Sequence, residues 1–403
     1  MLTNMSLLKV LIVTLLVLFP FGEIFRFNLG NNIYLKPLDI VAVLTLAWTT
    51  IFFVKDKSLR SSLKWYYFFF PIIGLIALLI NSTWLTSHEL LTSFLYLLRW
   101  AAYMSIFFAV IQFDKVFRKK IITLLLADGL VVLLLGYLQY FFYPSLQNLY
   151  YLGWDEHFYR MFSSFFDPNF VGSFFVLYLI FIAGFLFHNL NNYSKKEKFL
   201  YSSIAAMTLI GIFLTYSRSA LLMLIVSGII FFLLLQKKKF ILYLLGVIIG
   251  FVILISPFFY IANINLFRVT SSVERLQTAQ HALKIIQDHP IIGIGFDSYR
   301  YAQERYHFTA INPQFQAHSA AGEDTSLLFV FATTGIIGLV AYLYLWFQLV
   351  KKAKLSYRKN RFALIFIAST AGLFINALFI NSLFYPEIML WMWLMAGLMK
   401  EAK

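Results

Sequence analysis

Long apolar runs separated by short polar segments make up most of this chain. A helix needs about 20 residues to cross the roughly 30 Å of hydrocarbon in a bilayer, and twelve runs are of suitable length. The ninth and tenth runs are separated by a long, mostly polar stretch, residues 257–324. The pattern therefore predicts an all-α, polytopic integral membrane protein with about 12 transmembrane helices and a large loop between helices 9 and 10. The expected helices cover approximately residues 6–22, 37–54, 65–80, 91–112, 121–141, 169–188, 199–215, 219–235, 240–256, 325–349, 362–380 and 386–399.

Composition agrees with this pattern. Hydrophobic residues make up 61% of the chain and charged residues only 13%, too little polar material to cover a water-soluble surface. We therefore expect residues 1–403 to form a single membrane domain. The first run, residues 6–22, is followed by further spans and by no small-residue cleavage site, so we expect it to remain as a membrane anchor.

The positions of lysine and arginine predict the orientation, because cytoplasmic loops retain basic residues. Most of the 33 basic residues fall in the cytoplasm if both termini are placed there. The 257–324 loop is then extracytoplasmic, and the location is the inner (cytoplasmic) membrane. Topology alone accounts for these basic runs, so the net charge of +15 requires no nucleic-acid partner.

Ten basic residues remain on the extracytoplasmic side, and eight of them are arginine. Arginine presents a planar fork that grips phosphate oxygens in pairs, whereas lysine is a strongly hydrated point charge. This bias predicts an outward-facing phosphate or pyrophosphate site. The alternative is pairing with acidic residues on the same side, which we expect for about half of them. The ten are Arg26, Lys36, Arg99, Arg160, Arg218, Arg268, Arg275, Lys284, Arg300 and Arg305.

The sequence restricts the chemistry that any active site could use. Cysteine is absent, so catalysis would depend on His, Asp, Glu, Arg or hydroxyl groups. The sequence also has no Gly-rich nucleotide loop, no His-Glu-x-x-His motif and no Asp-x-Asp pair. We therefore expect no metal and no cofactor, and a transfer reaction would draw its energy from an already activated substrate.

Two short segments carry candidate phosphate-binding arginines. Arg160 precedes Asp167-Pro168-Asn169, a turn and helix-entry signal that favours a structural role for Asp167 and Asn169. Arg218 lies in the tight Ser217-Arg218-Ser219 hairpin, which places it at the membrane boundary. A lone arginine there could be a snorkelling anchor. Because a lipid-linked phosphate would lie at the same level, we favour a functional role.

The long loop itself contains a predicted helix. Ser271 and Glu274 have the spacing of a capping box, and apolar residues recur at helical spacing until His289-Pro290. We expect an amphipathic helix at about 271–288 that lies along the membrane surface or covers a cavity and carries Arg275. Gly293 and Gly295 follow it and permit a sharp turn.

The end of the loop offers candidate general bases. His318 and the pair Glu323-Asp324 lie where water meets the bilayer, so they could accept a proton from an incoming hydroxyl. The alternative for His318 is a solvated loop histidine without a chemical role. Gly335 and Gly338, one to two turns into the next helix, are typical of close helix packing.

Together these features resemble the O-antigen ligase / polysaccharide polymerase family, over nearly the whole chain and in order. The long loop between spans nine and ten is part of this resemblance. The shared motifs are Arg160 with Asp167-Pro168-Asn169, Ser217-Arg218-Ser219, His289-Pro290-Ile291-Ile292-Gly293-Ile294-Gly295, and the loop exit from His318 through Asp324, Ser326 and Leu328 to Gly335 and Gly338.

The resemblance implies a metal-independent glycosyltransferase with a membrane-embedded helical fold. Such enzymes transfer a glycan from undecaprenyl pyrophosphate to a glycan or lipid-glycan acceptor on the outer face of the cytoplasmic membrane. It also implies that Arg160 and Arg218 grip the pyrophosphate and that a histidine near the loop exit activates the acceptor hydroxyl.

This chain departs from the family at the loop exit. Counting back from Gly335 by the family's spacing leads to Asp324, where the family has its histidine. Either Asp324 or His318 could therefore hold the position of the base, and both stay open. We place Arg275 with the pyrophosphate-binding residues. The residues expected to support the substrate loop are Asp167, Asn169, Arg300 and Arg99.

Two other classes of protein compete with the enzyme. A flippase or transporter of lipid-linked glycan would also need outward arginines, although internal repeats and midplane charges would be expected. A membrane scaffold would not need the arginine bias. Within the enzyme class, a neighbouring flippase gene and chain-length regulator would indicate a polymerase, and a lipid A core locus would indicate a ligase. We keep a chain-length regulator protein as a candidate partner.

Overall fold

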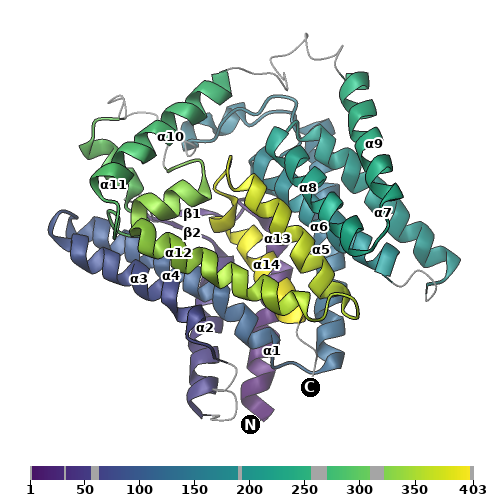
Figure 1. Ribbon diagram of the computed structural model, residues 1–403, viewed down its shortest axis with the longest axis horizontal. Coiled ribbons are helices and arrows are strands. Elements are labelled where there is room, and N and C mark those ends of the chain that lie inside the picture. Colours follow the sequence, from purple (N-terminus) through teal and green to yellow (C-terminus); the bar gives the residue numbers. More distant parts are fainter. Residues whose placement is uncertain are drawn as a thin grey trace.

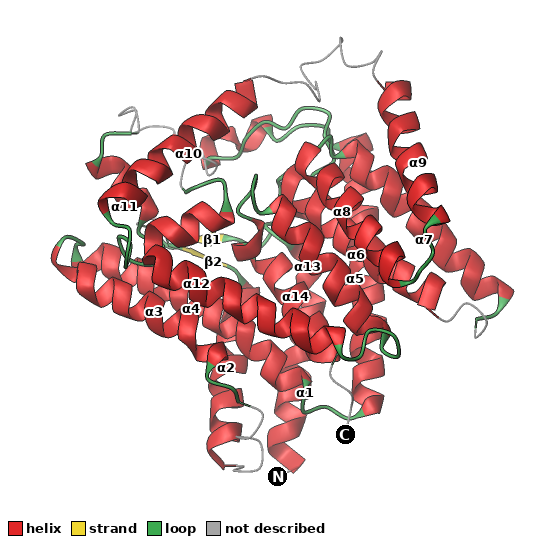
Figure 2. Cartoon of the chain, viewed as in Figure 1, coloured by secondary structure: helices red, strands yellow, loops and turns green. Residues whose placement is uncertain are grey.

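The computed structural model describes residues 2–30, 33–55, 63–188, 193–255, 270–308 and 322–399. Within these ranges the protein is all-α apart from one small hairpin (Figure 2). The helices are α1 (Leu2–Leu18), α2 (Pro37–Lys55), α3 (Tyr66–Ile80), α4 (Ser87–Val110), α5 (Lys115–Phe142), α6 (Pro168–His188), α7 (Lys195–Leu214), α8 (Arg218–Leu234), α9 (Lys239–Ile255), α10 (Thr270–Asp288), α11 (Tyr299–Arg305), α12 (Ser326–Lys354), α13 (Arg361–Asn376) and α14 (Pro386–Leu398).

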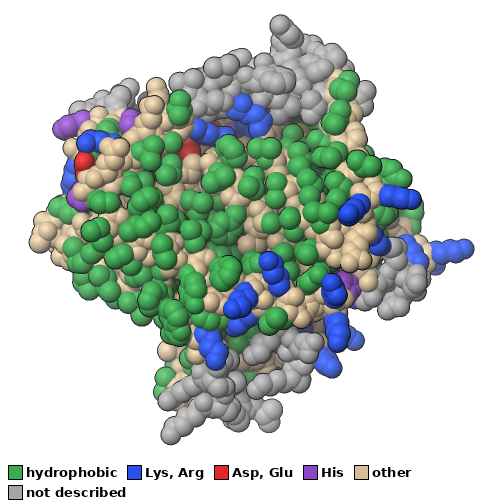
Figure 3. Space-filling view, viewed as in Figure 1, with side chains coloured by type: hydrophobic (Ala, Val, Ile, Leu, Met, Phe, Trp, Pro, Cys, Tyr) green, Lys and Arg blue, Asp and Glu red, His purple; other side chains and the backbone are tan. Residues whose placement is uncertain are grey.

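Several helices have the length and composition of membrane spans. Seven are long and apolar enough, namely α2, α3 with the turn that follows it, α4, α5, α6, α7 and α12. Five shorter apolar helices accompany them in the described residues. Hydrophobic side chains form a broad band over the face shown in Figure 3. The protein is thus a multi-pass membrane protein, and the number of twelve spans stays a prediction.

The described part of the long polar segment, which includes α10 and α11, lies beside the bundle. Helices α10 and α11 lie next to the first half of α12, whereas α1 and α2 extend from the opposite side (Figure 1). Helix α10 covers the range in which the sequence predicted an amphipathic helix. In its described part it buries Ala282 and Ile285 and exposes Leu276 and Leu283, so only one of its faces packs on the protein.

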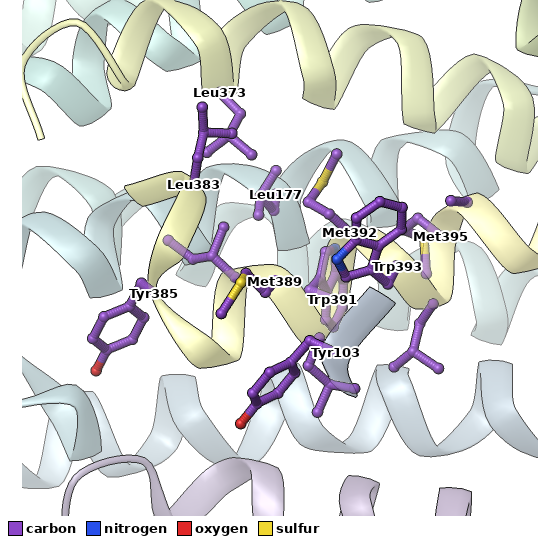
Figure 4. Packing of buried hydrophobic residues seen from close by; sticks show 14 of the residues in the cluster. Tyr103, Leu177, Leu373, Leu383, Tyr385, Met389, Trp391, Met392, Trp393 and Met395 are labelled. Carbon is purple, nitrogen blue, oxygen red and sulfur yellow. The ribbon is translucent and has the colours of Figure 1, made fainter. Parts of the chain in front are cut away.

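Helix α14 forms the centre of the bundle. All of its residues from Pro386 to Leu398 are buried. Trp391 packs against rings of α6, and Trp393 contacts rings of α4 and α12. Figure 4 shows both tryptophans among the buried side chains of α14. Lipid tails are as apolar as these side chains, so helix association in a membrane depends on close packing more than on the removal of apolar surface from water. Close packing of side chains around α14 therefore holds the helices together.

A buried ion-pair network fixes the short hairpin to the bundle. The hairpin pairs β1 (Phe27–Asn28) with β2 (Tyr34–Leu35) in antiparallel fashion. Just after it, the Lys36 ammonium lies 2.6 Å from Glu23 Oε1 and 2.9 Å from Glu387 Oε1 of α14. All three side chains are at most 6% exposed. Lys36 therefore bridges two buried carboxylates, and Arg26 lies 3.5 Å from one of them, Glu23.

Replacing Lys36 with methionine is expected to destabilise the protein by about 3–5 kcal/mol, because it leaves the two acids buried without their shared cation. The free energy of unfolding in detergent measures the effect. Adding Glu387→Met should recover much of the loss. The control is Lys9→Met. Lys9 pairs with an Asp114 carboxylate that is 54% exposed, so we expect the free energy of unfolding to change by less than about 1 kcal/mol. A Lys36 variant no less stable than this control would contradict the expectation.

Helix α12 is broken at Gly335. This residue has φ 64° and ψ −171° inside an otherwise helical segment. The turn segment that follows α10, residues 290–295, fills the break. Ile294 N donates to Ala332 O at 3.0 Å, Gly295 N donates to Thr333 O at 3.0 Å, and Ile336 N donates to Pro290 O at 2.9 Å. The loop therefore supplies hydrogen bonds that the helix gives up, as buried backbone groups in a membrane require.

The glycines on both sides of this junction let the two backbones touch. A Cβ atom on Gly335 would overlap the carbonyl of Ile291, and one on Gly293 would overlap the backbone between Ala332 and Thr334. Asn81 also holds the segment, because its Nδ2 donates to Gly293 O at 3.0 Å. Gly335 was predicted to serve close helix packing. The structure shows that it admits a loop segment into a helix break.

Candidate functional site

Arg160 joins two segments that are far apart in the sequence. Its side chain is 6% exposed, its Nε donates to Thr215 O at 2.9 Å, and its Nη2 lies 3.3 Å from Asn169 Oδ1. Gln139 of α5 donates to the carbonyl of Arg160 at 3.2 Å. The predicted pair of arginine motifs therefore meets, because Thr215 begins the turn that leads into Arg218.

Asp167 and Asn169 position the start of α6. Asp167 Oδ1 accepts hydrogen bonds from the backbone N–H groups of Asn169, at 2.6 Å, and Phe170, at 3.3 Å. This is a helix cap, which satisfies amide groups that have no partner within the helix. The cap turns Asn169 so that its side-chain oxygen reaches Arg160. Asp167 thus acts on the helix end, and Asn169 acts on the arginine.

Arg218 is the first residue of α8 and is half-buried. Ser217 precedes it and caps the helix by accepting a hydrogen bond from Ala220 N at 3.4 Å. The hairpin packs on the first turns of α6, since a Cβ atom on Gly172 would lie 2.9 Å from Thr215 Oγ1 and 3.0 Å from Ala220 Cβ. Close packing at Gly172 and the bond from Arg160 thus hold the Arg218 backbone from two directions.

Asp324 lies against α10, one turn from Arg275. Thr278 Oγ1 is 3.3 Å from Asp324 Oδ2 and 3.1 Å from the carbonyl of Arg275. The structure therefore brings the predicted base Asp324 and the predicted phosphate ligand Arg275 into one neighbourhood. The other predicted base, His318, lies outside the residues that the structure describes.

Glu323, which the sequence offered together with Asp324 as a candidate general base, is a buried acid. It is 2% exposed, and its Oε2 accepts a hydrogen bond from the Tyr299 hydroxyl at 3.0 Å. Thr325 Oγ1 lies 3.2 Å from its other oxygen. Burial raises the pKa of Glu323 to about 7, and the hydrogen bonds from Tyr299 and Thr325 oppose that rise. The signal in the sequence was the pair of acids at the entry to a span.

One short segment, residues 377–385, connects the two groups of residues. At one end, Ser326 N donates to Ala377 O at 3.0 Å, two residues after Asp324. At the other end, the Tyr385 ring stacks on Phe170 at 4.2 Å, next to Asn169. The Tyr385 hydroxyl also donates to Phe165 O at 3.3 Å. The residues around Asp324 and the residues around Arg160 therefore lie at opposite ends of the same segment, 377–385.

In the part of the chain that the structure describes, at least five of the ten basic residues singled out by the sequence have carboxylate partners. Arg99 Nη2 is 2.7 Å from Asp39 Oδ2 and 2.6 Å from Tyr34 O, so it ties α4 to α2 and the hairpin. Arg300 lies on α11 and is half-buried. The ion pairs are Arg26 with Glu23, Lys36 with Glu23 and Glu387, Arg99 with Asp39, Lys284 with Asp288, and Arg305 with Glu89.

The site therefore offers arginines, hydroxyls and carboxylates. Among the described residues, no three His, Asp or Glu side chains lie close enough to hold a metal ion. A group of this kind can bind an anion through guanidinium groups and accept a proton at a carboxylate.

Comparison with known proteins identifies one family. Residues 203–343 match the family model described as O-antigen ligase. The matched region runs from α7 through Arg218, α10 and Asp324 to beyond the break in α12, and it confirms the family predicted from the motifs. A search of curated proteins found no match.

Proposed function

Because this chain carries an O-antigen ligase domain in a multi-pass membrane protein, we propose that it transfers or polymerises an undecaprenyl-pyrophosphate-linked oligosaccharide onto an acceptor glycan. The family implies a glycosyltransferase with a lipid-linked donor and a glycan acceptor in a membrane. The observation that carries the proposal is the junction between Arg160 and the Arg218 turn, held by the bond to Thr215.

The two arginine segments are proposed to hold the pyrophosphate of the donor. As the bond between the sugar C1 and the pyrophosphate oxygen breaks, the leaving pyrophosphate gains negative charge. Guanidinium groups fixed near the low-dielectric edge of a membrane stabilise that charge more than water-exposed ones would. Arg160 is buried and held at its Nε, which supports this role, and Arg275 extends the site from α10.

The acceptor hydroxyl is proposed to lose its proton to Asp324 as its oxygen bonds to C1. Asp324 lies beside Thr278 and one helical turn from Arg275, so a base and a phosphate ligand share one neighbourhood. His318 remains the alternative base. The products are the new glycosidic bond, undecaprenyl pyrophosphate and a proton on the base, so no further reactant is required.

The orientation of the reaction follows from α12 in this proposal. Helix α12 starts next to α10 and ends with Lys351, Lys352 and Lys354 in its last turn. Basic residues flank spans on the cytoplasmic side, so we place α10, α11 and the site at the outer face of the cytoplasmic membrane, with both termini inside. The length of the product separates a polymerase from a ligase.

Replacing Arg218 with lysine is expected to lower the rate of glycan transfer about 10- to 100-fold, because the charge stays but the paired grip on two phosphate oxygens is lost. The rate is measured in membranes supplied with lipid-linked oligosaccharide extracted from cells that lack this protein. The matched control is Arg305→Lys, since Arg305 pairs with Glu89 and stacks on Trp84 away from this group.

Full activity of the Arg218→Lys variant would contradict the pyrophosphate grip. Movement of the donor across the membrane without a new glycosidic bond would instead assign the protein to the flippases. A tenfold loss of the transfer rate in the Arg305→Lys control would show that the effect is not specific to Arg218. This result would also contradict the pyrophosphate grip.

A further inference from the structure

The Tyr299 hydroxyl joins α10 to the end of the long loop. Tyr299 is the first residue of α11 and is 1% exposed. Its hydroxyl donates to Glu323 Oε2 at 3.0 Å, and the same oxygen lies 3.4 Å from Thr278 O of α10. The Thr278 hydroxyl in turn lies 3.3 Å from Asp324 Oδ2. These four residues form one hydrogen-bonded cluster, because Glu323 and Asp324 are neighbours in the chain.

The cluster is anchored to the bundle through Tyr299. This residue directly follows Ser298, whose hydroxyl bonds to the carbonyls of Ile294, at 2.8 Å, and Gly295, at 2.6 Å. The N–H groups of Ile294 and Gly295 are the ones that donate to α12. The backbone at Tyr299 is therefore fixed relative to α12, and its hydroxyl bonds both the loop exit and α10 to that fixed point.

Glu323 is held in a way that costs stability. Its Oε1 lies 3.2 Å from Thr325 Oγ1 and 3.4 Å from Thr325 N, so both of its oxygens have partners. Burial raises the pKa of Glu323 to about 7, and the negative charge of the adjacent Asp324 adds to the rise. A buried acid next to a second acid is unfavourable, and such pairs concentrate at functional sites.

We propose that Tyr299 and Glu323 are positioning residues that hold Asp324 where it accepts the proton of the acceptor hydroxyl. This inference rests on the proposed function, in which Asp324 is the general base. Glu323 is 2% exposed and bonded at both oxygens, so its effect on a substrate passes through its neighbour Asp324. Tyr299 contacts Glu323 and the backbone of α10, and it therefore acts through both.

The cluster favours proton transfer in two ways. It restrains Asp324 at the backbone through Glu323 and at the side chain through Thr278, so less reorganisation is needed when the acceptor arrives. It also places a second carboxylate beside the base, and negative charge on one acid favours uptake of a proton by the other.

The step balances without a further reactant. The acceptor O–H proton moves to Asp324 while the acceptor oxygen bonds to the sugar C1. The pyrophosphate leaves with the electron pair of the broken C1–O bond.

The first test replaces Tyr299 with phenylalanine in the full chain purified in detergent. Phenylalanine keeps the buried ring and removes only the hydroxyl. We expect kcat for transfer of extracted lipid-linked oligosaccharide to fall about 10-fold, because Asp324 is held less firmly. KM for the donor and binding of sugar-free undecaprenyl pyrophosphate should change less than about twofold, since the arginines are untouched.

The matched control is Tyr178→Phe. The Tyr178 hydroxyl donates to Leu126 O at 2.8 Å and ties α6 to α5. Each variant loses one tyrosine hydroxyl that bonds to a partner, so we expect their melting temperatures to fall by similar amounts. Only the Tyr299 variant should lose transfer, and an equal loss in both would overturn the inference.

A double variant separates positioning from a general effect on the fold. In an Asp324→Asn background no base remains to be positioned, so adding Tyr299→Phe should lower the residual kcat by less than about twofold. A further independent loss of about 10-fold would show that Tyr299 does not act through Asp324, and would overturn the inference.

The pH dependence of kcat provides a further readout. The Tyr299 hydrogen bond lowers the pKa of Glu323, so Tyr299→Phe should raise that pKa above about 7. Ionised Glu323 accepts the stronger hydrogen bond and favours proton uptake by Asp324. The wild-type kcat should therefore rise through about pH 7, and the rise should move to higher pH in Tyr299→Phe.

Glu323→Gln should remove this rise near pH 7, because glutamine does not titrate. The other titratable or charged groups around Glu323 are Tyr299 of α11, the adjacent Asp324, and Arg275, one turn from Thr278 on α10. They are the same in the wild type and in Glu323→Gln, so the difference between the two profiles belongs to Glu323.

Unchanged kcat in Tyr299→Phe would overturn the inference. If that variant does not fold, Glu323→Gln carries the same test, since glutamine keeps the size of the side chain and an oxygen that accepts the Tyr299 bond. An unchanged kcat and pH profile in Glu323→Gln would then overturn it. Failure of the proposed function would appear differently, as a wild type that does not bind undecaprenyl pyrophosphate.

Discussion

Replacing Asp324 with asparagine is expected to lower kcat for glycan transfer by about 10²–10⁴-fold, the usual contribution of a general base. Asparagine keeps the size of the side chain and an oxygen that can still accept the hydrogen bond from Thr278. It loses only the ability to take a proton. Binding of undecaprenyl pyrophosphate should stay within about twofold of wild type, because the arginines remain in place.

His318→Gln is the companion variant, because it removes the other candidate base with little change in size. We expect it to keep most of the transfer rate. The opposite pattern, in which the His318 variant is inactive and the Asp324 variant active, would assign the proton to His318. Near-normal rates in both variants would show that neither residue is the base, and Glu323, with its pKa near 7, would then be the next residue to change.

Gly335→Ala is expected to destabilise the protein by about 3 kcal/mol or more. The new Cβ would overlap the carbonyl of Ile291, and the left-handed φ of 64° disfavours any residue with a side chain. Strain of this kind costs about 1–3 kcal/mol, and overpacking adds a similar amount. The measurement is the free energy of unfolding in detergent, together with the amount of folded protein recovered from membranes.

The control for this prediction is Gly250→Ala in α9. Nothing lies within 4 Å of a Cβ at that position, and alanine favours helix over glycine by about 1 kcal/mol. Both substitutions add one methyl group, but only Gly335 has a left-handed φ and a carbonyl where the new Cβ would lie, so a difference in stability reports the backbone conformation and the contact at Gly335. Equal stability of the two variants would show that the junction between α12 and Ile291 does not require a glycine at position 335.

The sequence predicted most of what local patterns determine. Apolar runs of the right length gave the membrane helices, and the spacing of apolar residues after Ser271 predicted the helix that the structure has as α10. The choice of arginine over lysine on one side led to Arg160 and Arg218, whose segments are joined by the hydrogen bond from Arg160 to Thr215. These features depend on residue type and near-neighbour spacing, which a single sequence contains.

Other features depended on contacts between distant segments. Gly335 has the same local pattern whether a helix passes through it or breaks there, and only the pairing with Ile291 distinguishes the two. Glu323 looked equivalent to Asp324 until Tyr299 was placed beside it.

The junction at α12 fixes one part of the polar segment to the helix bundle. Residues 290–295 are fastened to the helix by backbone hydrogen bonds, so they share its rigidity. Any opening that admits a bulky glycan must therefore come from elements other than this one, and amide exchange at Ile294, Gly295 and Ile336 should be as slow as in the bundle core. Substrates would therefore pass residues 290–295 without displacing them.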